Sequence, residues 1–172
     1  EYDPTHENWF KVKVTDFWGL NSTGSGMTNS IDLEPNLVNV TSVTYDLESM
    51  TITWEDYVPN LSRINQMNQN TRSTVTNDFV SYGLLQSDSE DGTYTSIIVI
   101  TDQSTASHSL TEYDPTHENW FKVKVTDFWE QNSTGSGMTN SIDSVPTPVN
   151  VISLSYDLTE MVVSWNQSSD ND

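Results

Sequence analysis

The sequence predicts an all-β fold made of tandem antiparallel β-sandwiches, and two observations lead to this fold class. First, residues 1–32 recur as residues 112–143, with changes only at the paired positions 19/130 and 20/131. Second, apolar residues alternate with polar ones over short stretches such as residues 9–14, whereas no long stretch has a helical period. A fixed offset over a long span is the signature of a repeated structural unit.

The repeat divides the chain into one complete module flanked by two partial ones. The offset of 111 residues (112 − 1) continues past the identical block and pairs Tyr45 with Tyr156 and Trp54 with Trp165. Neither outer part is long enough to bury a core of its own. The predicted parts are residues 1–33, the last two strands of a preceding module; residues 34–144, the complete module; and residues 145–172, the first two strands of a following module.

The complete module carries an insertion at about residues 57–73. Between Trp54 and Asn77 there are 22 residues, whereas only five separate the equivalent Trp165 from Asn171, so 17 residues (22 − 5) are extra. The basic unit is then 94 residues long (111 − 17), a length typical of one β-sandwich.

Seven short strands are predicted for the complete module, each bounded by turn-forming residues. They are residues 38–45, 50–54, 79–86, 94–100, 107–110, 120–128 and 136–142. In the sixth strand, Phe121, Val123 and Val125 share one face and lysines occupy the other, so one face lies in the core and one in solvent. The predicted core of the module is Trp54, Tyr82, Leu84, Phe121, Val123 and Val125.

Three packing motifs resemble those of the fibronectin type III family. The second strand ends in tryptophan, as MTITW at Met50–Trp54 and again as MVVSW at Met161–Trp165. The third strand contains a tyrosine and a leucine two residues apart, Tyr82 and Leu84. The sixth strand carries the pattern aromatic-x-Val-x-Val at residues 121–125.

The resemblance covers the whole chain and implies a seven-stranded antiparallel sandwich of the fibronectin type III or immunoglobulin-like kind. The sequence is also similar to repeats of very large surface or secreted proteins of marine bacteria. Loops after the second and sixth strands share an end in this fold, so the insertion is expected beside the loop Gly135–Met138. Phe121 stands where the family usually has a tyrosine whose hydroxyl binds the backbone, and Tyr113 or Trp120 are candidates to replace it.

Composition and charge exclude several classes of partner. Acidic residues outnumber basic ones by 25 to 6, and a net charge of −19 opposes binding to nucleic acids and to anionic membrane surfaces. No apolar run approaches the length of about 18 residues that spans a bilayer. There is no cysteine, so neither disulfides nor thiol chemistry arise. An acidic surface with few lysines suits a protein outside the cell or at its surface.

No catalytic motif is complete, and the protein is predicted not to be an enzyme. His6-Glu7 and its copy His117-Glu118 begin like a zinc-binding helix motif, but no second histidine follows four residues after the first. These histidines are interpreted as turn residues. The Gly-Ser-Gly stretches at 24–26 and 135–137 lack the spacing of a nucleophile elbow and are interpreted as flexible loops.

Calcium is the one candidate cofactor, and solvated acidic turns are the alternative interpretation. Calcium takes about six to eight oxygen ligands, which acidic loops and module junctions supply. The candidate ligands are Asp88, Glu90, Asp91, Asp170 and Asp172, followed by the pairs Asp56 with Asp78 and Asp32 with Glu34. None of these groups matches an EF-hand loop.

The candidate partner-binding residues are Arg63, Arg72 and Trp129. The chain has only these two arginines, and both lie in the insertion. Trp129 follows Phe128, and an exposed aromatic pair there would stack on a sugar ring or on a neighbouring module; the alternative is partial burial of Trp129 against the loop after the second strand. Within the insertion, a short helix is predicted from the spacing of Leu61, Ile64 and Met67.

These observations predict a non-enzymatic, extracellular tandem array that acts as a structural spacer or presents repeated weak binding faces. The expected partners are other copies of the module, through strand exchange or docking of the partial modules, and a protein or glycan ligand. The alternative function is a spacer within a secreted polysaccharide-degrading enzyme, which the flanking sequence would identify. A third hypothesis is a receptor-type binding module, whose partner capture would be lost on deletion of residues 57–73.

Overall fold

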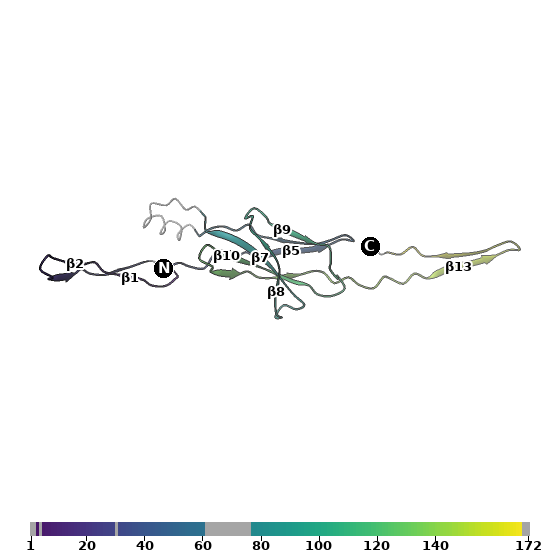
Figure 1. The fold of residues 1–172 in the computed structure, drawn as a ribbon. Coiled ribbons are helices and arrows are strands. Elements are labelled where there is room, and N and C mark those ends of the chain that lie inside the picture. Colours follow the sequence, from purple (N-terminus) through teal and green to yellow (C-terminus); the bar gives the residue numbers. More distant parts are fainter. Residues whose placement is uncertain (1–2, 4, 30, 61–76, 170–172) are drawn as a thin grey trace.

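The protein consists of a central β-sandwich with a β-hairpin projecting from each end (Figure 1). The computed structural model describes residues 3, 5–29, 31–60 and 77–169, and every regular element in these residues is a strand. The N-terminal hairpin contains β1 (Trp9–Phe10), β2 (Lys13–Thr15), β3 (Asn21–Thr23) and β4 (Met27–Thr28), and the C-terminal hairpin contains β13 (Val151–Tyr156) and β14 (Met161–Trp165). The sandwich contains β5 (Val40–Tyr45), β6 (Met50–Trp54), β7 (Phe79–Ser87), β8 (Thr95–Ile100), β9 (Ser107–Leu110), β10 (Trp120–Asp127), β11 (Asn132–Thr134) and β12 (Met138–Thr139).

Two antiparallel sheets face each other in the sandwich. One has the order β5–β6–β9, and the other has the order β11–β10–β7–β8, with β12 also paired to β10. The chain therefore changes sheet after β6, after β8 and after β9, as in sandwiches with Greek-key connections. The predicted fold class, an all-β antiparallel sandwich, is confirmed.

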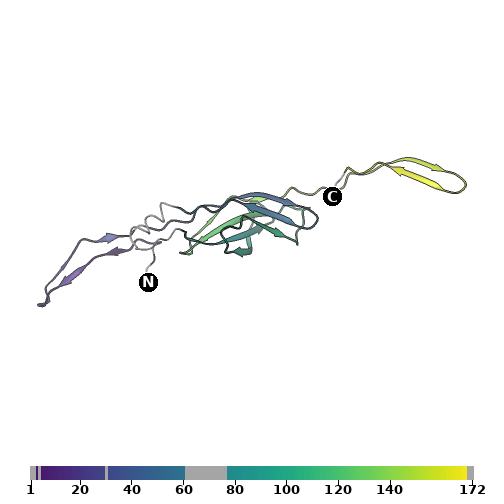
Figure 2. The ribbon, with the colours of Figure 1, turned by 90° about the horizontal axis from the view of Figure 1, so that it is seen from above.

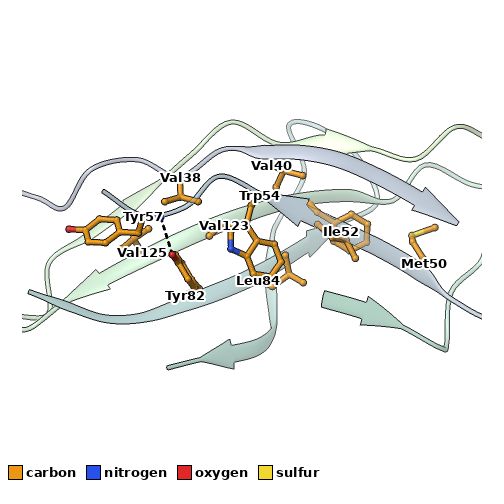
Figure 3. Packing of buried hydrophobic residues seen from close by; sticks show 11 residues of the cluster. Val38, Val40, Met50, Ile52, Trp54, Tyr57, Tyr82, Leu84, Val123 and Val125 are labelled. Atoms are coloured by element: carbon orange, nitrogen blue, oxygen red, sulfur yellow. Dashed lines mark hydrogen bonds between the residues drawn. The ribbon is translucent and has the colours of Figure 1, made fainter. Parts of the chain in front are cut away.

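The core lies between the two sheets, where alternate residues of facing strands point toward one another (Figure 3). Trp54 lies at its centre, with its ring centroid 5.9 Å from that of Tyr82 and its indole Nε1 donating to Thr105 O at 3.1 Å. All six core residues predicted from the sequence are buried. The buried apolar cluster is Val38, Val40, Met50, Ile52, Trp54, Tyr57, Tyr82, Leu84, Phe121, Val123 and Val125.

Tyr57 belongs to this core, although the sequence placed it in the insertion. Its backbone N donates to Tyr82 Oη at 3.1 Å, the dashed line of Figure 3, and its own hydroxyl donates to Asp78 Oδ1 at 3.1 Å. The Tyr82 hydroxyl in turn donates to Gln103 O. The side chain of Tyr57 thus completes the core at the residue where the sequence placed the approximate start of the insertion.

The buried Tyr82 phenol is expected to make the sandwich less stable in alkali. Burial raises the pKa of Tyr82, against the opposing effect of the hydrogen bond from Tyr57 N. An unfolded tyrosine has a pKa of about 10. The stability that the neutral, buried phenol of Tyr82 contributes is therefore complete below that pH, and it is lost as the pH rises through the higher pKa of the folded state. Urea unfolding at pH 8 and at pH 10.5 should show a smaller alkaline loss of unfolding free energy in Tyr82→Phe than in the wild type. Equal losses in the two proteins would contradict a raised pKa of Tyr82 in the folded state.

The last strand of the module differs from its prediction. The sequence predicted one strand at residues 136–142, but the structure has two short strands, β11 and β12, on either side of Gly135–Gly137. The reason is an early, tight turn after β10. The Asp127 carboxylate accepts hydrogen bonds from the backbone N atoms of Trp129 and Gln131, and Glu130 has a positive φ of 63°. This turn brings the chain back onto β10 four residues earlier than expected.

The same turn corrects a second expectation, that the loop Gly135–Met138 lies at the end of the sandwich where the insertion is expected. Gly135 N donates to Val123 O in the middle of β10, so Gly135–Met138 does not lie at an end of the sandwich. The turn after β10 does, and Phe128 N in it donates to Asp78 O, next to the point where the chain re-enters the described residues. Residues 61–76 lie outside the described part, with Arg63, Arg72 and the short helix predicted there.

Tyr113 supplies the backbone hydrogen bond that Phe121 cannot make. Its hydroxyl donates to Asp46 O in the turn between β5 and β6. Trp120, the other candidate, instead donates from Nε1 to Glu118 Oε2 at 2.9 Å. The connection from β9 to β10 is thereby attached to the β5–β6 turn of the sheet that contains β9.

The two hairpins keep the pairing register of their counterparts in the sandwich, although two short strands, β1 and β2, stand where the sandwich has the continuous β10. Lys13 pairs with Thr23 as Lys124 pairs with Thr134. In the C-terminal hairpin, β13 and β14 keep the register of β5 and β6, with the irregularity at the same place. The hairpins extend from opposite ends of the sandwich, as the view from above also shows (Figure 2).

Each hairpin exposes the face that the sandwich buries. Phe10 is 61% exposed whereas its equivalent Phe121 is 0% exposed, and Trp165 is 62% exposed whereas Trp54 is 3% exposed. The same side chains on the same local backbone thus lie in solvent or in a core, depending only on whether a second sheet faces them.

Candidate functional site

A seam between the two sheets closes one edge of the sandwich, where residues 36–40 lie against residues 133–136. Val40 N donates to Ser136 O at 3.2 Å. The Asn39 side chain receives hydrogen bonds at 2.9 Å from both N and Oγ of Ser136. Ser133 Oγ donates to Asn36 O at 3.2 Å. The seam therefore joins the beginning of the module to its last strand by backbone and side-chain bonds.

Gly135 permits the close approach of the two chain segments at the seam. A Cβ atom at this position would lie 1.9 Å from Val38 O and 2.5 Å from Val38 C, where no side chain fits. The interpretation of Gly135–Gly137 as a flexible loop is therefore wrong. These residues are held between β10 on one side and residues 38–40 on the other.

The turn after β10 also contacts the linker that leads in from the N-terminal hairpin. Gln131 Nε2 donates to Asp32 Oδ2 at 2.8 Å, and Asp32 is only 8% exposed. Position 131 is one of the two at which the copies differ, since Leu20 stands there in the first copy. The sequence difference thus falls on a contact between one module and the linker from the preceding one.

The predicted aromatic pair lies in the same turn. The rings of Phe128 and Trp129 are perpendicular, with centroids 5.2 Å apart. Phe128 is 68% exposed, whereas Trp129 is half-buried, in agreement with the predicted alternative of partial burial. In the N-terminal hairpin, the equivalent Phe17 and Trp18 keep the perpendicular geometry and are both exposed.

The acidic candidates for calcium that lie in the described residues do not form one cluster. Among the described residues, no group of three or more histidine, aspartate or glutamate side chains is placed to hold a metal ion. Asp88, Glu90 and Asp91 are exposed in the turn after β7. The Asp78 carboxylate accepts from Tyr57 and that of Asp32 from Gln131, as above, while Asp56 is exposed. Asp170 and Asp172 lie outside the described residues, so calcium binding stays a prediction.

His117 lies in a turn, as the sequence indicated. Its Nδ1 is 3.1 Å from Asp114 Oδ2. The Thr116 hydroxyl and then the Thr116 backbone N hydrogen-bond to Asp114 and lower the pKa of its carboxyl. An open depression next to this turn is lined by Asp88, Asp114, His117, Glu118 and Asn119. Within the turn, Asn119 Nδ2 also donates to the backbone oxygens of Asp114 and His117, so His117 is part of a hydrogen-bonded turn.

The described part of the chain contains no helix with the length and apolarity needed to cross a membrane.

Comparisons with known proteins concern the fold. No protein-family model matches the chain, and a search of curated proteins finds no match. Among solved structures, a fibronectin type III domain of the human KIAA0970 protein is similar, with a TM-score of 0.44 and 15% identity over 72% of this chain and 85% of that one. The FN1–FN3 domains of chicken CNTN1 are similar with a TM-score of 0.40 and 15% identity, over 94% of this chain and 54% of that one, about half its length. The strand order and register of the sandwich establish the fold independently of these likenesses.

Proposed function

We propose that the chain is a non-enzymatic, extracellular spacer in a tandem array of a large surface protein, of the kind suggested by its resemblance to bacterial repeats. The observation that carries the proposal is the contact between Gln131 and Asp32, which links one module to the linker from the preceding one. A spacer needs modules that keep their orientation, and a partly buried contact at the junction opposes bending.

Two further features support this function. The hairpins leave the sandwich at opposite ends, so successive units add length along one direction (Figure 1). A net charge of −19 keeps such an array soluble and extended, because its units repel one another. An adhesive role would use the exposed Phe128 at the same junction, where repeated weak contacts would add up along the array.

The junction contact is expected to restrict the orientation of the N-terminal hairpin. Replacing Gln131 with leucine, the residue of the other copy, removes a hydrogen bond to a carboxylate, which is worth about 1.5–3 kcal/mol. The population in which the linker leaves the turn should therefore increase about tenfold or more. The chain has no cysteine, so single spin labels can be attached at Thr23→Cys in the N-terminal hairpin and at Thr95→Cys in the sandwich. Pulsed electron paramagnetic resonance then measures the distance between the hairpin and the sandwich.

The expected result is a broader distance distribution in Gln131→Leu than in the wild type. The matched control is Thr134→Ala, an exposed position on β11, which should leave the distribution unchanged. Equal distributions for the wild type and Gln131→Leu would overturn the role of this contact in setting the orientation of the modules.

A further inference from the structure

The turn between β9 and β10 gathers reactive groups around one peptide bond, the bond between Asp114 and Pro115. An aspartate carboxylate can attack the carbonyl carbon of its own residue and close a cyclic anhydride, a reaction that needs no diffusing nucleophile. The nitrogen of an X–Pro bond belongs to a tertiary amide, which is more basic than other amide nitrogens and leaves more readily once it is protonated. Such a bond is prone to self-cleavage where the fold holds the attacking and protonating groups in place.

The fold holds these groups around Asp114. Its Oδ1 accepts from N and Oγ of Thr116 at 2.9 and 2.6 Å, and its Oδ2 lies 3.1 Å from Nδ1 of His117. The backbone oxygen of Asp114, on the carbon that the carboxylate would attack, accepts from Asn119 Nδ2 at 2.9 Å. A donor at this oxygen stabilises the negative charge that develops there during the attack.

The same groups surround Asp3 in the N-terminal hairpin. Its carboxylate accepts from N and Oγ of Thr5 and lies 2.8 Å from Nδ1 of His6. Its backbone oxygen accepts from Asn8 Nδ2 at 2.7 Å. Both copies of the repeat thus build the arrangement from the same local sequence.

Two other aspartate turns provide a comparison within the chain. The carboxylate of Asp102 accepts from N and Oγ of Ser104, and that of Asp157 accepts from N and Oγ of Thr159. No proline follows either aspartate. Within the described residues, neither carboxylate has a histidine as a hydrogen-bond partner. The proline, the histidine and the amide donor therefore distinguish the turn at Asp114 from an ordinary aspartate turn.

We propose that the chain cleaves itself at the bond between Asp114 and Pro115 in mild acid. An oxygen of the Asp114 carboxylate forms a bond to the carbonyl carbon of the same residue. The bond from that carbon to the nitrogen of Pro115 breaks, and the nitrogen keeps the electron pair and takes up a proton from the protonated ring of His117. The cyclic anhydride left on Asp114 is then opened by water to two carboxyl groups. The reaction happens once per site, so it adds to the spacer function without making the chain an enzyme.

The cleavage rate is expected to pass through a maximum in mild acid. An imidazole takes up its second proton between about pH 8 and pH 5, so the proton for the proline nitrogen is supplied toward the acidic side. The hydroxyl and then the backbone N of Thr116 lower the pKa of the Asp114 carboxyl, so the attacking carboxylate persists there. In stronger acid the carboxylate is protonated and the rate falls. The other charged groups at this open depression are Asp88 and Glu118.

A cut at this bond leaves the sandwich assembled, because β10 on one fragment stays paired with β7 on the other. Mass spectrometry of the full chain under denaturing conditions, after incubation at about pH 5.5 and at pH 8, therefore tests the proposal. The expected fragments are residues 1–114 and 115–172, together with the loss of residues 1–3 by the equivalent cut. The bonds that follow Asp102 and Asp157 should stay intact.

The same incubation in concentrated urea gives the rate for an unfolded Asp–Pro bond. The folded chain should be cleaved at least about tenfold faster, because only the fold positions the amide donor and the histidine. Equal rates in the folded and unfolded chains, or an intact bond at Asp114 in the folded chain, would overturn the proposal. Either result leaves the spacer function standing, since that function rests on the contact between Gln131 and Asp32.

Two variants separate the roles of the side chains, with circular dichroism to establish that each is folded. His117→Gln should slow cleavage about 100-fold, at the lower end of the usual contribution of a general acid, and should remove the rise in rate from pH 8 to pH 5.5. Asn119→Ala should slow cleavage about tenfold and keep that rise. The matched control is Thr111→Ala, an exposed residue of the same connection, which should be cleaved like the wild type. Cleavage of His117→Gln at the wild-type rate would overturn the proposal.

Discussion

Replacing Trp54 with alanine is expected to destabilise the sandwich by about 3–5 kcal/mol, the usual cost of truncating a large buried aromatic side chain. Trp54 is only 3% exposed, contacts Tyr82 and donates a hydrogen bond to Thr105 O. The substitution leaves a cavity between the sheets and an unpaired carbonyl, and neither sheet can close on the space without moving its strands.

The chain contains its own control for this prediction. Trp165 occupies the equivalent position on β14 but is 62% exposed, so Trp165→Ala should change the unfolding free energy of the sandwich by less than about 0.5 kcal/mol. Urea unfolding of both variants, followed by circular dichroism, gives the comparison. A loss below about 1 kcal/mol for Trp54→Ala would show that Trp54 does not occupy the centre of the core.

Gly135→Ala is expected to destabilise the sandwich by about 3 kcal/mol, at the upper end of the usual cost of overpacking. The added Cβ would meet the backbone of Val38, which cannot rotate away as a side chain can. To relieve the contact, residues 38–40 must separate from residues 135–136, and the hydrogen bond from Val40 N to Ser136 O is then lost.

Gly24→Ala places the same side chain on the same sequence, in a hairpin that has no facing sheet. It should leave the unfolding free energy of the sandwich unchanged under conditions in which the chain is monomeric. A double comparison of Gly24→Ala and Gly135→Ala by thermal and urea unfolding therefore separates the seam from the intrinsic preference of the loop. Similar melting temperatures for both variants would indicate that the seam is not closely packed.

Strand positions could be predicted wherever the sequence alternates between apolar and polar residues. Phe121, Val123 and Val125 alternate with lysines, and all three lie in the core as expected. MTITW at Met50–Trp54 forms β6 with the predicted bounds. Such positions follow from local periodicity alone, because a strand with one wet face has only one register that buries its apolar side chains.

Contacts between distant segments could not be predicted in this way. The seam depends on the distance between Val38 and Gly135, and nothing in a Gly-Ser-Gly stretch distinguishes a close backbone contact from a flexible loop. Tyr57 was assigned to the insertion because the insertion was located from the difference in length between the two repeats. That difference gives the number of extra residues but does not show which side chains pack in the core. One signal was present: residues 130 and 131 are the only differences between the copies, and Gln131 contacts the preceding linker.

The hairpins keep their registers without a facing sheet, and this sets an order of events for folding. Residues 40–54 and residues 120–139 each close through contacts between neighbours in sequence, so both hairpins can form early and independently. The step that remains is non-local: β7, in the segment between them, must find β10 and so bring the two sheets together. Folding of each module is therefore expected to be limited by that joining step, and its rate should depend on the length of chain between β7 and β10.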